Sequence, residues 1–195
     1  MLAALILSGG ASSRMGSPKA LLPYQGRPFL EHLLDVTRNP RIGMRRVVLG
    51  AHADPITDAI PLDPNEIVIN SEWEKGQLSS IRAGLRSLPS GTTGMLLCLI
   101  DHPLISTALV DALIDQFYAT RAPIVLPVFE GKRGHPVIFS AALYSELEGA
   151  SDSLGARSVV WAHTKEVSEF HTQEEGCVVN LNDPETFERL TGPSS

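Results

Sequence analysis

Cysteine is scarce in this chain, and long apolar runs are missing from it. The two cysteines, Cys98 and Cys177, stand far apart with no CxxC or CxxH companion, which argues against a disulfide framework and a zinc site. We expect two buried, unreactive thiols in a reducing cytoplasm. No apolar run approaches the roughly 20 residues of a membrane helix, and the apolar start lacks a charged segment before it. Neither a membrane span nor a signal peptide is therefore predicted.

Positive charge is also in short supply. The formal net charge is −6, so the chain has no overall basic field for a nucleic-acid backbone, and long nucleic acid is not an expected partner. Any bound phosphate must be met by local basic side chains and backbone N–H groups. With 43% hydrophobic and 19% charged residues, the composition is that of a globular protein. We expect one domain over residues 1–190 and a disordered tail at 191–195.

Short apolar segments alternate with helical patterns along the chain. The segments are too continuous for a sheet with one face in water, which favours mostly parallel strands covered on both sides. They predict an α/β fold, a Rossmann-like three-layer sandwich with a mostly parallel central sheet. Residues 127–139 form either a hairpin or a long excursion over the binding edge, and residues 149–175 are weakly periodic. Strands are expected at 3–7, 46–49, 66–70, 95–100, 124–128 and 136–139, and helices at 28–37, 80–88 and 106–118.

A glycine-rich segment follows the first expected strand. Residues 7–19 combine glycines and small hydroxyl side chains with Arg14 and Lys19, a mixture suited to phosphate. Glycines let consecutive N–H groups approach phosphate oxygens, Arg14 offers a two-pronged donor, and Lys19 offers a mobile charge. An ordinary strand-to-helix turn with solvated charges is the alternative. The fingerprint GxGxxG is absent, and a P-loop would need lysine where Ser17 follows Gly16. A different nucleotide-binding loop is predicted.

This loop resembles the signature of the MobA-like nucleotidyltransferases, and the resemblance extends from residue 2 to residue 185. It implies a fold of the nucleotide-diphospho-sugar transferase type. The matching loop positions are Leu7, Gly9, Gly10, Ser12, Arg14, Met15, Gly16 and Lys19, with Ser8 where alanine is more usual, and the match continues in Leu21, Leu22, Pro23, Gly26, Arg27, Pro28 and Leu30.

The resemblance also implies roles for the loop residues. Arg14 and Lys19 are expected to be catalytic, because they would stabilise the charge that builds on the phosphates during attack at the α-phosphorus. The residues expected to wrap the triphosphate are Leu7, Ser8, Gly9, Gly10, Ala11 and Ser12, together with Arg14 and Lys19.

Asp101 directly follows the apolar residues 95–100, which places a carboxylate at the carboxyl end of an expected central strand. Open α/β sheets bind ligands at that edge, and Mg²⁺ commonly takes one or two protein oxygens there. A turn or helix-cap aspartate is the alternative. With Pro103 and Leu104, Asp101 is similar to a family motif whose aspartate binds the metal. The resemblance therefore implies that Asp101 is a catalytic Mg²⁺ ligand, whereas His102 is read as incidental.

A second metal ligand is implied near the end of the chain. Residues 179–185 are similar to the family's closing motif, in which Asn182 aligns best with the metal-contacting position and Asn180 is the fallback. An amide oxygen can bind Mg²⁺ but adds no charge, so substrate phosphates would hold much of the ion. Whether Mn²⁺ replaces Mg²⁺ stays open.

Two further segments resemble the family's binding regions. Gly76, Ser79 and Ser80 are similar to a stretch that contacts base and ribose, with helix capping by the serines as the alternative. A second group of basic and titratable side chains lies around Gly131 and Gly134. Such side chains are suited to an anionic acceptor, although a polar hairpin tip would have the same composition. Both segments are more similar to the branch that transfers CMP to molybdopterin than to the guanylyl branch. The residues of the acceptor group are Lys132, Arg133, Gly134 and His135.

The resemblance as a whole implies transfer of a nucleotide, CMP before GMP, from CTP or GTP to the terminal phosphate of a molybdopterin-type acceptor. Nucleotidylation of a sugar phosphate is a near alternative. A non-catalytic nucleotide-binding partner in molybdoenzyme maturation, in contact with maturation proteins, is an alternative of another class. A dinucleotide-dependent oxidoreductase is a third, disfavoured by the missing GxGxxG.

Overall fold

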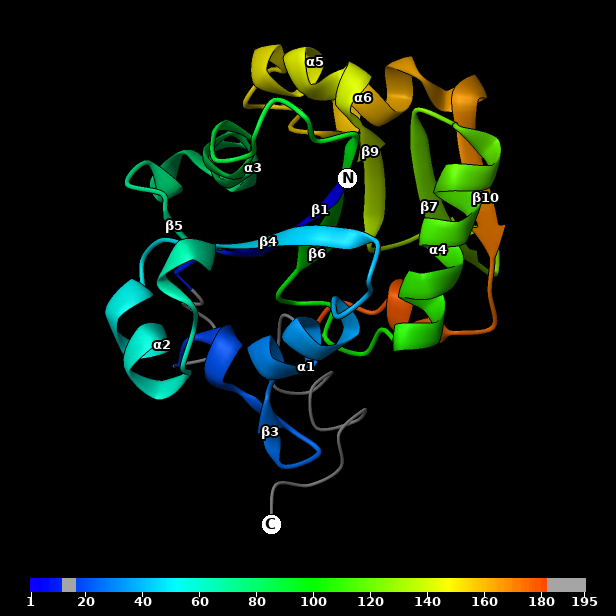
Figure 1. The fold of residues 1–195 in the computed structure, drawn as a ribbon. Helices are drawn as coiled ribbons and strands as arrows, with labels where there is room; N and C mark the ends of the chain where they lie inside the picture. The colour runs from blue at the N-terminus through cyan, green and yellow to red at the C-terminus, as the bar shows by residue number, and fades with distance from the viewer. Residues whose placement is uncertain (12–16, 182–195) are drawn as a thin grey trace.

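The computed structural model describes residues 1–11 and 17–181. These two ranges form an eight-stranded sheet in the order β10-β7-β9-β6-β1-β4-β5, with β8 paired to β7, and a small separate hairpin of β2 and β3 (Figure 1). The strands are Leu2–Ser8 (β1), Pro23–Tyr24 (β2), Arg27–Pro28 (β3), Ile42–Leu49 (β4), Ile67–Ile69 (β5), Gly94–Leu99 (β6), Ile124–Phe129 (β7), Lys132–Arg133 (β8), Val137–Ser140 (β9) and Val167–His171 (β10).

The sheet is mostly parallel, as predicted. Strands β1, β4, β5 and β6 run parallel to one another, and β7 is parallel to β10. Strand β9 runs antiparallel to both of its neighbours, β6 and β7. Every residue of β1 and β6 is buried, because helices cover both faces of the sheet at its centre. The continuous apolar character of these strands follows from that double coverage.

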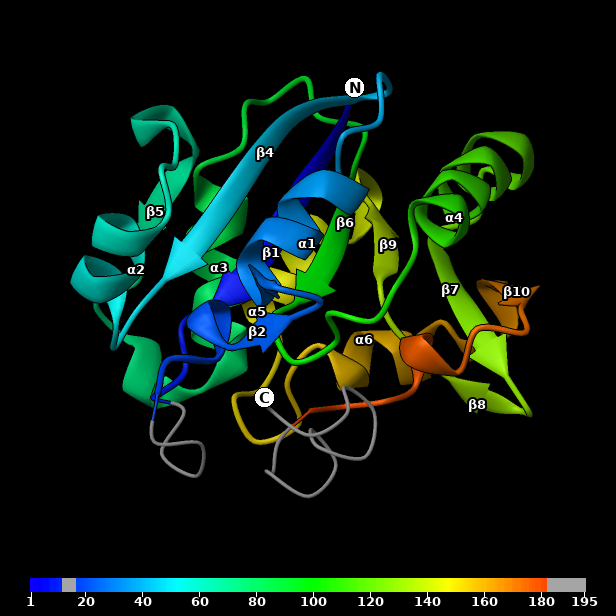
Figure 2. The same cartoon turned by 90° about the horizontal axis from the view of Figure 1, so that it is seen from below.

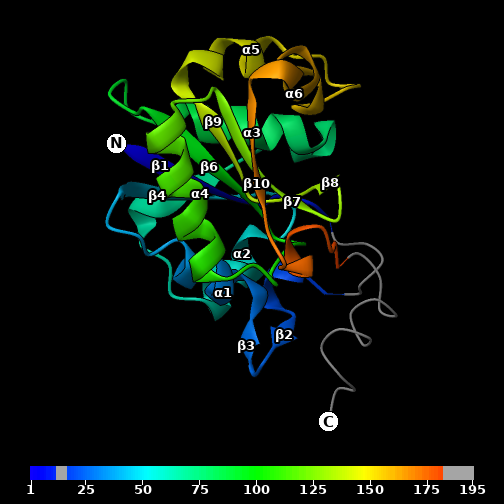
Figure 3. The same cartoon turned by 90° about the vertical axis from the view of Figure 1, so that its right-hand side faces the viewer.

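Helices pack on both faces of the sheet and give three layers (Figures 1 and 3). One apolar cluster joins α1, α2 and α4 to side chains such as Ile6 and Val47, and the other joins α3, α5 and α6 to side chains such as Leu5 and Val48. Alternate residues of a strand therefore enter opposite clusters. The helices are Phe29–Val36 (α1), Ala53–Ala59 (α2), Gln77–Arg86 (α3), Thr107–Thr120 (α4), Tyr144–Gly149 (α5) and Arg157–Ala162 (α6).

The sequence of helix α4 accounts for its start, its buried face and its end. Ser106 caps it by accepting a hydrogen bond from the Leu109 N–H at 3.0 Å, and its hydroxyl donates to the Glu174 carboxylate at 2.6 Å. Leu109, Leu113 and Phe117 repeat at helical spacing and are buried. Burial of each such side chain stabilises the fold by about 1.5–3 kcal/mol. The helix ends at Arg121, which adopts a left-handed conformation.

All the predicted strands and helices exist, with ends shifted by a few residues. Residues 127–139 form a hairpin, in which β7 turns into β8 through Glu130 and Gly131, both at positive φ. Short elements escaped prediction: α2, α5, α6, β10 and the hairpin of β2 and β3. The helices among them span seven residues or fewer, and β10 mixes polar with apolar residues. Neither the short helices nor β10 therefore shows a clear periodicity of apolar residues in the sequence.

Both thiols are free and buried, as expected. Burial raises the pKa of Cys98 to about 12 and that of Cys177 to about 11, so both stay protonated and unreactive. No helix in the described part of the chain is long and apolar enough to cross a membrane.

Candidate active site

The predicted loop and the predicted metal ligand lie at the same edge of the sheet. Strands β1, β4 and β6 are parallel neighbours, so their carboxyl ends meet on one side of the molecule, where the arrowheads of β4 and β6 point the same way (Figure 2). Leu7 pairs with Leu99, and the N–H of Ile100 donates to the carbonyl oxygen of Leu7 at 3.1 Å. The start of the glycine loop is thereby fixed beside Asp101.

A cavity of about 220 Å³ opens at this edge. It gathers residues from the glycine loop, from the start of α3 and from the end of β6. The structure thus brings together most of the described residues predicted to bind the nucleotide and the metal. The lining residues are Leu7, Ser8, Gly9, Gly10, Lys19, Trp73, Gly76, Gln77, Ser80, Leu99, Ile100 and Asp101.

Close packing shapes the loop at Gly9. A Cβ added to Gly9 would lie 2.6 Å from the Ser80 hydroxyl oxygen, so the backbone passes α3 where no side chain fits. A Cβ on Gly50, which follows β4, would overlap the Gly9 carbonyl oxygen and come within 2.7 Å of the Trp73 Cβ. That carbonyl accepts a hydrogen bond from the Ala51 N–H at 3.2 Å. Gly9, which follows β1, and Gly50, which follows β4, therefore set the path of the loop.

Serines at the start of α3 have separate surroundings. Gly76 precedes the helix at φ 94°, a conformation that favours glycine, and it lines the cavity together with Ser80. The buried amide of Asn70 donates to the hydroxyl oxygens of Ser79 at 2.8 Å and Ser80 at 3.0 Å. Ser79 lines a neighbouring cavity, and its hydroxyl donates to the carbonyl oxygens of Glu72 and Gly76. The structure does not bring Ser79 into the cavity of the glycine loop.

Asp101 lies at the cavity wall with its backbone firmly held. Its carbonyl oxygen accepts a hydrogen bond from the N–H of the buried Leu181 at 2.8 Å, so residues 179–181 end beside the predicted metal ligand. Asn180 is exposed. Within residues 1–11 and 17–181, no three His, Cys, Asp or Glu side chains form a group that could hold a metal ion. A metal at Asp101 would therefore need further ligands that are not such a cluster of side chains.

A second cavity, of about 360 Å³, adjoins the first, because Gln77 lines both. Arg133, Gly134 and His135 of the predicted acceptor group lie in its wall, whereas Lys132 is exposed and does not line it. Arg133 is held by Glu169 of β10, with 2.8 Å between the guanidinium Nε and the carboxylate oxygen. The backbone of Gly134 passes so close to the Cys177 carbonyl that a Cβ would overlap it. Three of the four predicted acceptor residues thus meet in one cavity.

His102, which is buried, lies beside His135, which is half-buried in the wall of the second cavity. The rings of His102 and His135 have centroids 4.9 Å apart, and neither Nδ1 atom has a hydrogen-bond partner among the described residues. Burial lowers the pKa of His102; the Asp101 charge opposes that shift and the Lys19 charge adds to it. Burial, aided by His102, lowers the pKa of His135 to about 4. Both imidazoles are therefore neutral at neutral pH. His102, read as incidental, packs against His135, one of the predicted acceptor residues.

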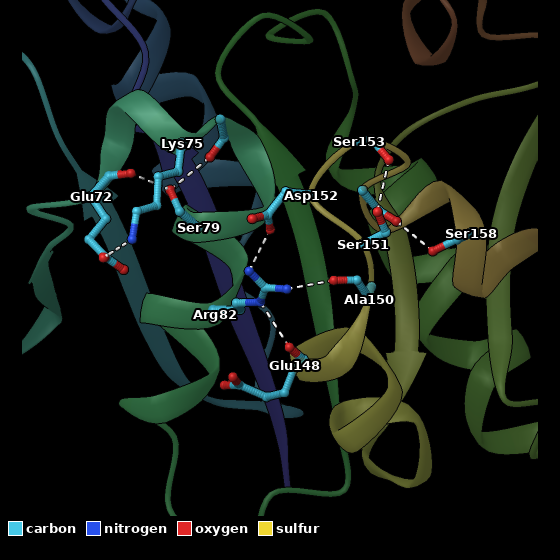
Figure 4. Close-up of polar contacts among 12 residues, drawn as sticks. Glu72, Lys75, Ser79, Arg82, Glu148, Ala150, Ser151, Asp152, Ser153 and Ser158 are labelled. Atoms are coloured by element: carbon cyan, nitrogen blue, oxygen red, sulfur yellow. Dashed lines mark hydrogen bonds and ion pairs between the residues drawn. The ribbon is translucent and has the colours of Figure 1, made fainter.

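Arg82 of α3 holds residues 148–152, the segment that precedes the residues 154–157 of the second cavity (Figure 4). Its Nε donates to the Glu148 carbonyl oxygen at 2.9 Å, its Nη2 to the Ala150 carbonyl oxygen at 2.6 Å, and its Nη1 to the Asp152 carboxylate at 2.6 Å. Residues 154–157, which follow, line the second cavity. The helix that contributes Gln77 and Ser80 to the first cavity therefore also holds the segment that borders the second.

Several predicted residues do not line the first cavity or fall beyond the described ranges. Ser12, Arg14 and Asn182 lie outside the described residues, as does the tail at 191–195, and Ala11 is described but does not line the first cavity. Sequence reasoning missed Trp73 and Gln77 as lining residues, although both flank Gly76 in a stretch already singled out. It also missed Gly50, for which a single glycine after a strand gave no signal.

Comparison with known proteins agrees with this geometry. The sequence profile of the MobA-like NTP transferase domain matches residues 4–167. The chain is 32% identical over 165 residues to nicotine blue oxidoreductase of Paenarthrobacter nicotinovorans, with 78% of each protein covered. It is 28% identical over 196 residues to molybdenum cofactor guanylyltransferase of Xanthomonas euvesicatoria pv. vesicatoria, covering 95% of this chain and 92% of the relative.

Among solved structures, Rv0371c from Mycobacterium tuberculosis superposes with a TM-score of 0.86 at 28% identity, covering 98% of this chain and 97% of the other. A manganese complex of the same protein superposes with a TM-score of 0.80 at 26% identity, covering 99% of both chains. The fold is that of the nucleotide-diphospho-sugar transferases, an α/β architecture with its ligand edge at the strand ends. Within that class, the chain belongs to the MobA-like NTP transferase domain family.

Proposed function

We propose that this protein transfers a nucleotidyl group, CMP from CTP in the first place, to the terminal phosphate of molybdopterin or a related cofactor precursor. One observation carries the proposal: the glycine loop, Lys19 and Asp101 share a cavity that adjoins, at Gln77, a second cavity containing Arg133 and His135. A nucleotide and a phosphorylated acceptor can therefore meet between the two.

The reaction is a displacement at phosphorus. An oxygen of the acceptor phosphate forms a bond to the α-phosphorus, the bond from that phosphorus to the bridging oxygen breaks, and pyrophosphate leaves with the electron pair. The backbone of Gly9 and Gly10 would orient the triphosphate, and the Lys19 ammonium would neutralise the charge that grows on the leaving group. Arg14, outside the described residues, is assigned the same role. Positioning and charge neutralisation are the main demands of this chemistry.

Asp101 fits a divalent cation. It presents a carboxylate at the ligand edge of the sheet, and Mg²⁺ usually takes one or two protein oxygens and leaves its other positions to water and phosphate. When bound, such a cation supplies Lewis-acid polarisation of the phosphate oxygens. We assign Mg²⁺ to Asp101, with Asn182 as the second ligand and Asn180 as the fallback. The manganese complex of Rv0371c supports metal binding by a protein of this fold and keeps Mn²⁺ as an alternative ion.

The sequence and the relatives favour different nucleotide bases for the NTP donor. The resemblance of residues 78–85 and 133–137 to the cytidylyl branch favours CMP, whereas the name of the Xanthomonas relative, a molybdenum cofactor guanylyltransferase, favours GMP. Pyrophosphate release should be measured with each of the four NTPs, Mg²⁺ and purified molybdopterin. We expect release with CTP, and release with GTP alone would correct the base but keep the reaction. Release with glucose 1-phosphate and not with molybdopterin would transfer the proposal to sugar-phosphate nucleotidylation.

Two alternatives of other classes have distinct outcomes in that assay. Nucleotide binding without turnover on any acceptor would favour a non-catalytic partner of molybdoenzyme maturation. The relative named nicotine blue oxidoreductase gives specific support to a reductase, although GxGxxG is absent from this chain. Oxidation of NADH or NADPH in the presence of an acceptor, or an NAD-dependent rise in melting temperature, would favour that alternative.

Arg82 should affect the acceptor more than the nucleotide. Arg82→Gln removes the guanidinium that holds two carbonyl oxygens of residues 148–150, so the segment that leads to residues 154–157 of the second cavity loses its anchor. Misplacement of a binding wall commonly costs about tenfold or more. We expect the acceptor KM to rise about tenfold while the NTP KM changes less than about twofold.

Arg86→Gln is the matched control for this prediction. Arg86 lies one turn further along α3, is 64% exposed against 20% for Arg82, and pairs with the side chain of Glu148 rather than with the loop backbone. Steady-state kinetics of Arg86→Gln should match the wild type. Equal increases of both KM values in Arg82→Gln would indicate general destabilisation instead of a positioning role.

A further inference from the structure

Asn70 is a buried asparagine between the end of β5 and the start of α3. It is 4% exposed, and its backbone N–H donates to the Leu49 carbonyl oxygen at 2.8 Å. Asn70 does not itself line the first cavity. A buried amide group must find its hydrogen-bond partners within the protein, because water no longer reaches it. The partners of the Asn70 side chain therefore show what it holds in place.

The orientation of the Asn70 amide follows from those partners. Its side-chain oxygen accepts a hydrogen bond from the Glu72 N–H at 3.0 Å, and a backbone N–H can only donate. The oxygen must therefore face Glu72, which leaves the NH₂ group for α3. That group donates to the hydroxyl oxygens of Ser79 at 2.8 Å and Ser80 at 3.0 Å. Both serine oxygens act as acceptors toward Asn70, so their own protons must point elsewhere.

The two serine hydroxyl groups differ in where they donate. Ser79 donates to the carbonyl oxygens of Glu72 at 2.9 Å and Gly76 at 2.8 Å, the second of which is a common partner for a serine in a helix (Figure 4). Within residues 1–11 and 17–181, the Ser80 hydroxyl donates to no other group. Ser80 is 4% exposed and lines the first cavity. Its proton is therefore available to a ligand in that cavity.

The Ser80 hydroxyl lies beside the glycine loop. A Cβ on Gly9 would be 2.6 Å from the Ser80 hydroxyl oxygen, so this oxygen adjoins the loop backbone that the proposed function assigns to the nucleotide. A nucleotide offers many acceptor atoms, and its phosphate oxygens can only accept. Because Asn70 already donates to the Ser80 oxygen, the hydroxyl is set as a donor before any ligand enters.

We propose that Asn70 is a positioning residue for the nucleotide: its amide holds the Ser80 hydroxyl as a donor that points into the first cavity and binds an acceptor atom of the NTP. This inference rests on the proposed function and adds to its site a residue that touches no substrate. It also divides the two serines, because Ser80 serves the nucleotide whereas Ser79 serves the start of α3. A hydroxyl that is oriented in advance lowers the entropic cost of binding.

Ser80→Ala tests the donor. Loss of one such hydrogen bond commonly weakens binding by a factor of about ten, so the Kd of CTP or GTP with Mg²⁺, measured by calorimetry without acceptor, should rise about tenfold. Ser79→Ala is the matched variant, because Asn70 donates to that hydroxyl as well. We expect Ser79→Ala to lower the melting temperature and to leave the Kd within about twofold of the wild type. Equal increases of the Kd in both variants would overturn the inference.

Asn70→Asp tests the positioning role. It keeps the oxygen that accepts from the Glu72 N–H and replaces the donor with a second acceptor, so the Ser80 proton should turn toward the new carboxylate. We expect the NTP Kd to rise about tenfold when Ser80 is present and less than about twofold in the Ser80→Ala background. The same factor in both backgrounds would indicate charge repulsion or a general loss of structure, and it would overturn the inference.

Binding to the wild-type protein separates failure of the inference from failure of the proposed function. If none of the four NTPs binds in the presence of Mg²⁺, the proposed function is contradicted. If an NTP binds the wild-type protein and the Kd is unchanged in Ser80→Ala, the inference alone is contradicted. That second outcome does not depend on the stability of Asn70→Asp, because Ser80→Ala leaves Asn70 in place.

Discussion

Asp101→Ala is expected to reduce turnover by at least about 10³-fold, because it removes the carboxylate assigned to the divalent cation. The fold should persist. The contacts that hold this segment use backbone atoms, namely the Ile100 N–H to Leu7 and the Asp101 carbonyl to Leu181, and alanine retains them. The loss should therefore appear in kcat without a fall in melting temperature beyond a few degrees.

Initial rates of pyrophosphate release and thermal melts give the measurement. Asp101→Asn keeps the shape and removes the charge, so it should be nearly as inactive as alanine. Asp58→Ala, an exposed aspartate on α2, is the control and should behave as wild type. Full turnover in Asp101→Ala would remove this residue from the metal site.

Gly50→Ala should weaken nucleotide binding, although Gly50 itself does not line the cavity. The new Cβ would overlap the Gly9 carbonyl oxygen and crowd the Trp73 Cβ at 2.7 Å, so the glycine loop must shift from its observed path. Forced insertion of a methyl group into such packing commonly costs about 1–3 kcal/mol. We expect the KM for the NTP to rise at least about tenfold, together with a lower melting temperature.

Gly91→Ala is the control for this substitution. A Cβ at Gly91 meets no atom within 4 Å, so stability and KM should both stay unchanged. Circular dichroism shows whether Gly50→Ala remains folded at the assay temperature. A folded Gly50→Ala variant with a wild-type KM would mean that the loop tolerates displacement and that its observed path is not required for nucleotide binding.

The elements near the sheet centre were predictable because their sequence patterns are strong. The apolar residues of β1 and β6 are covered on both faces, and α4 carries a cap and a clear apolar stripe. Helices α2, α5 and α6 were not predictable, because elements of seven residues or fewer complete hardly two turns. Within the described part of the chain, edge strand β10 pairs only with β7. Its polar residues obscure the alternation of apolar and polar residues that is typical of a strand.

The candidate site was predictable where one stretch of sequence carries it. The glycines with Lys19, Asp101 after its strand, and the basic group between two glycines all depend on local composition. Gly50 could not be found this way, because its importance comes from Gly9 and Trp73, which are distant in the chain and lie against it. The pairing of Ser79 with Asn70, away from the cavity, was equally invisible.

The sequence by itself determined the class of fold and the chemical parts: a glycine-rich loop with basic side chains, a strand-end carboxylate and a second basic segment. Hydrophobic periodicity and residue chemistry are local properties, so they can be read along the chain. The tertiary structure decided which of these parts face one another, since parallel pairing of β1 with β6 places the loop beside Asp101 and α3 separates Ser80 from Ser79. Such distances depend on packing between distant segments, and no local pattern encodes them.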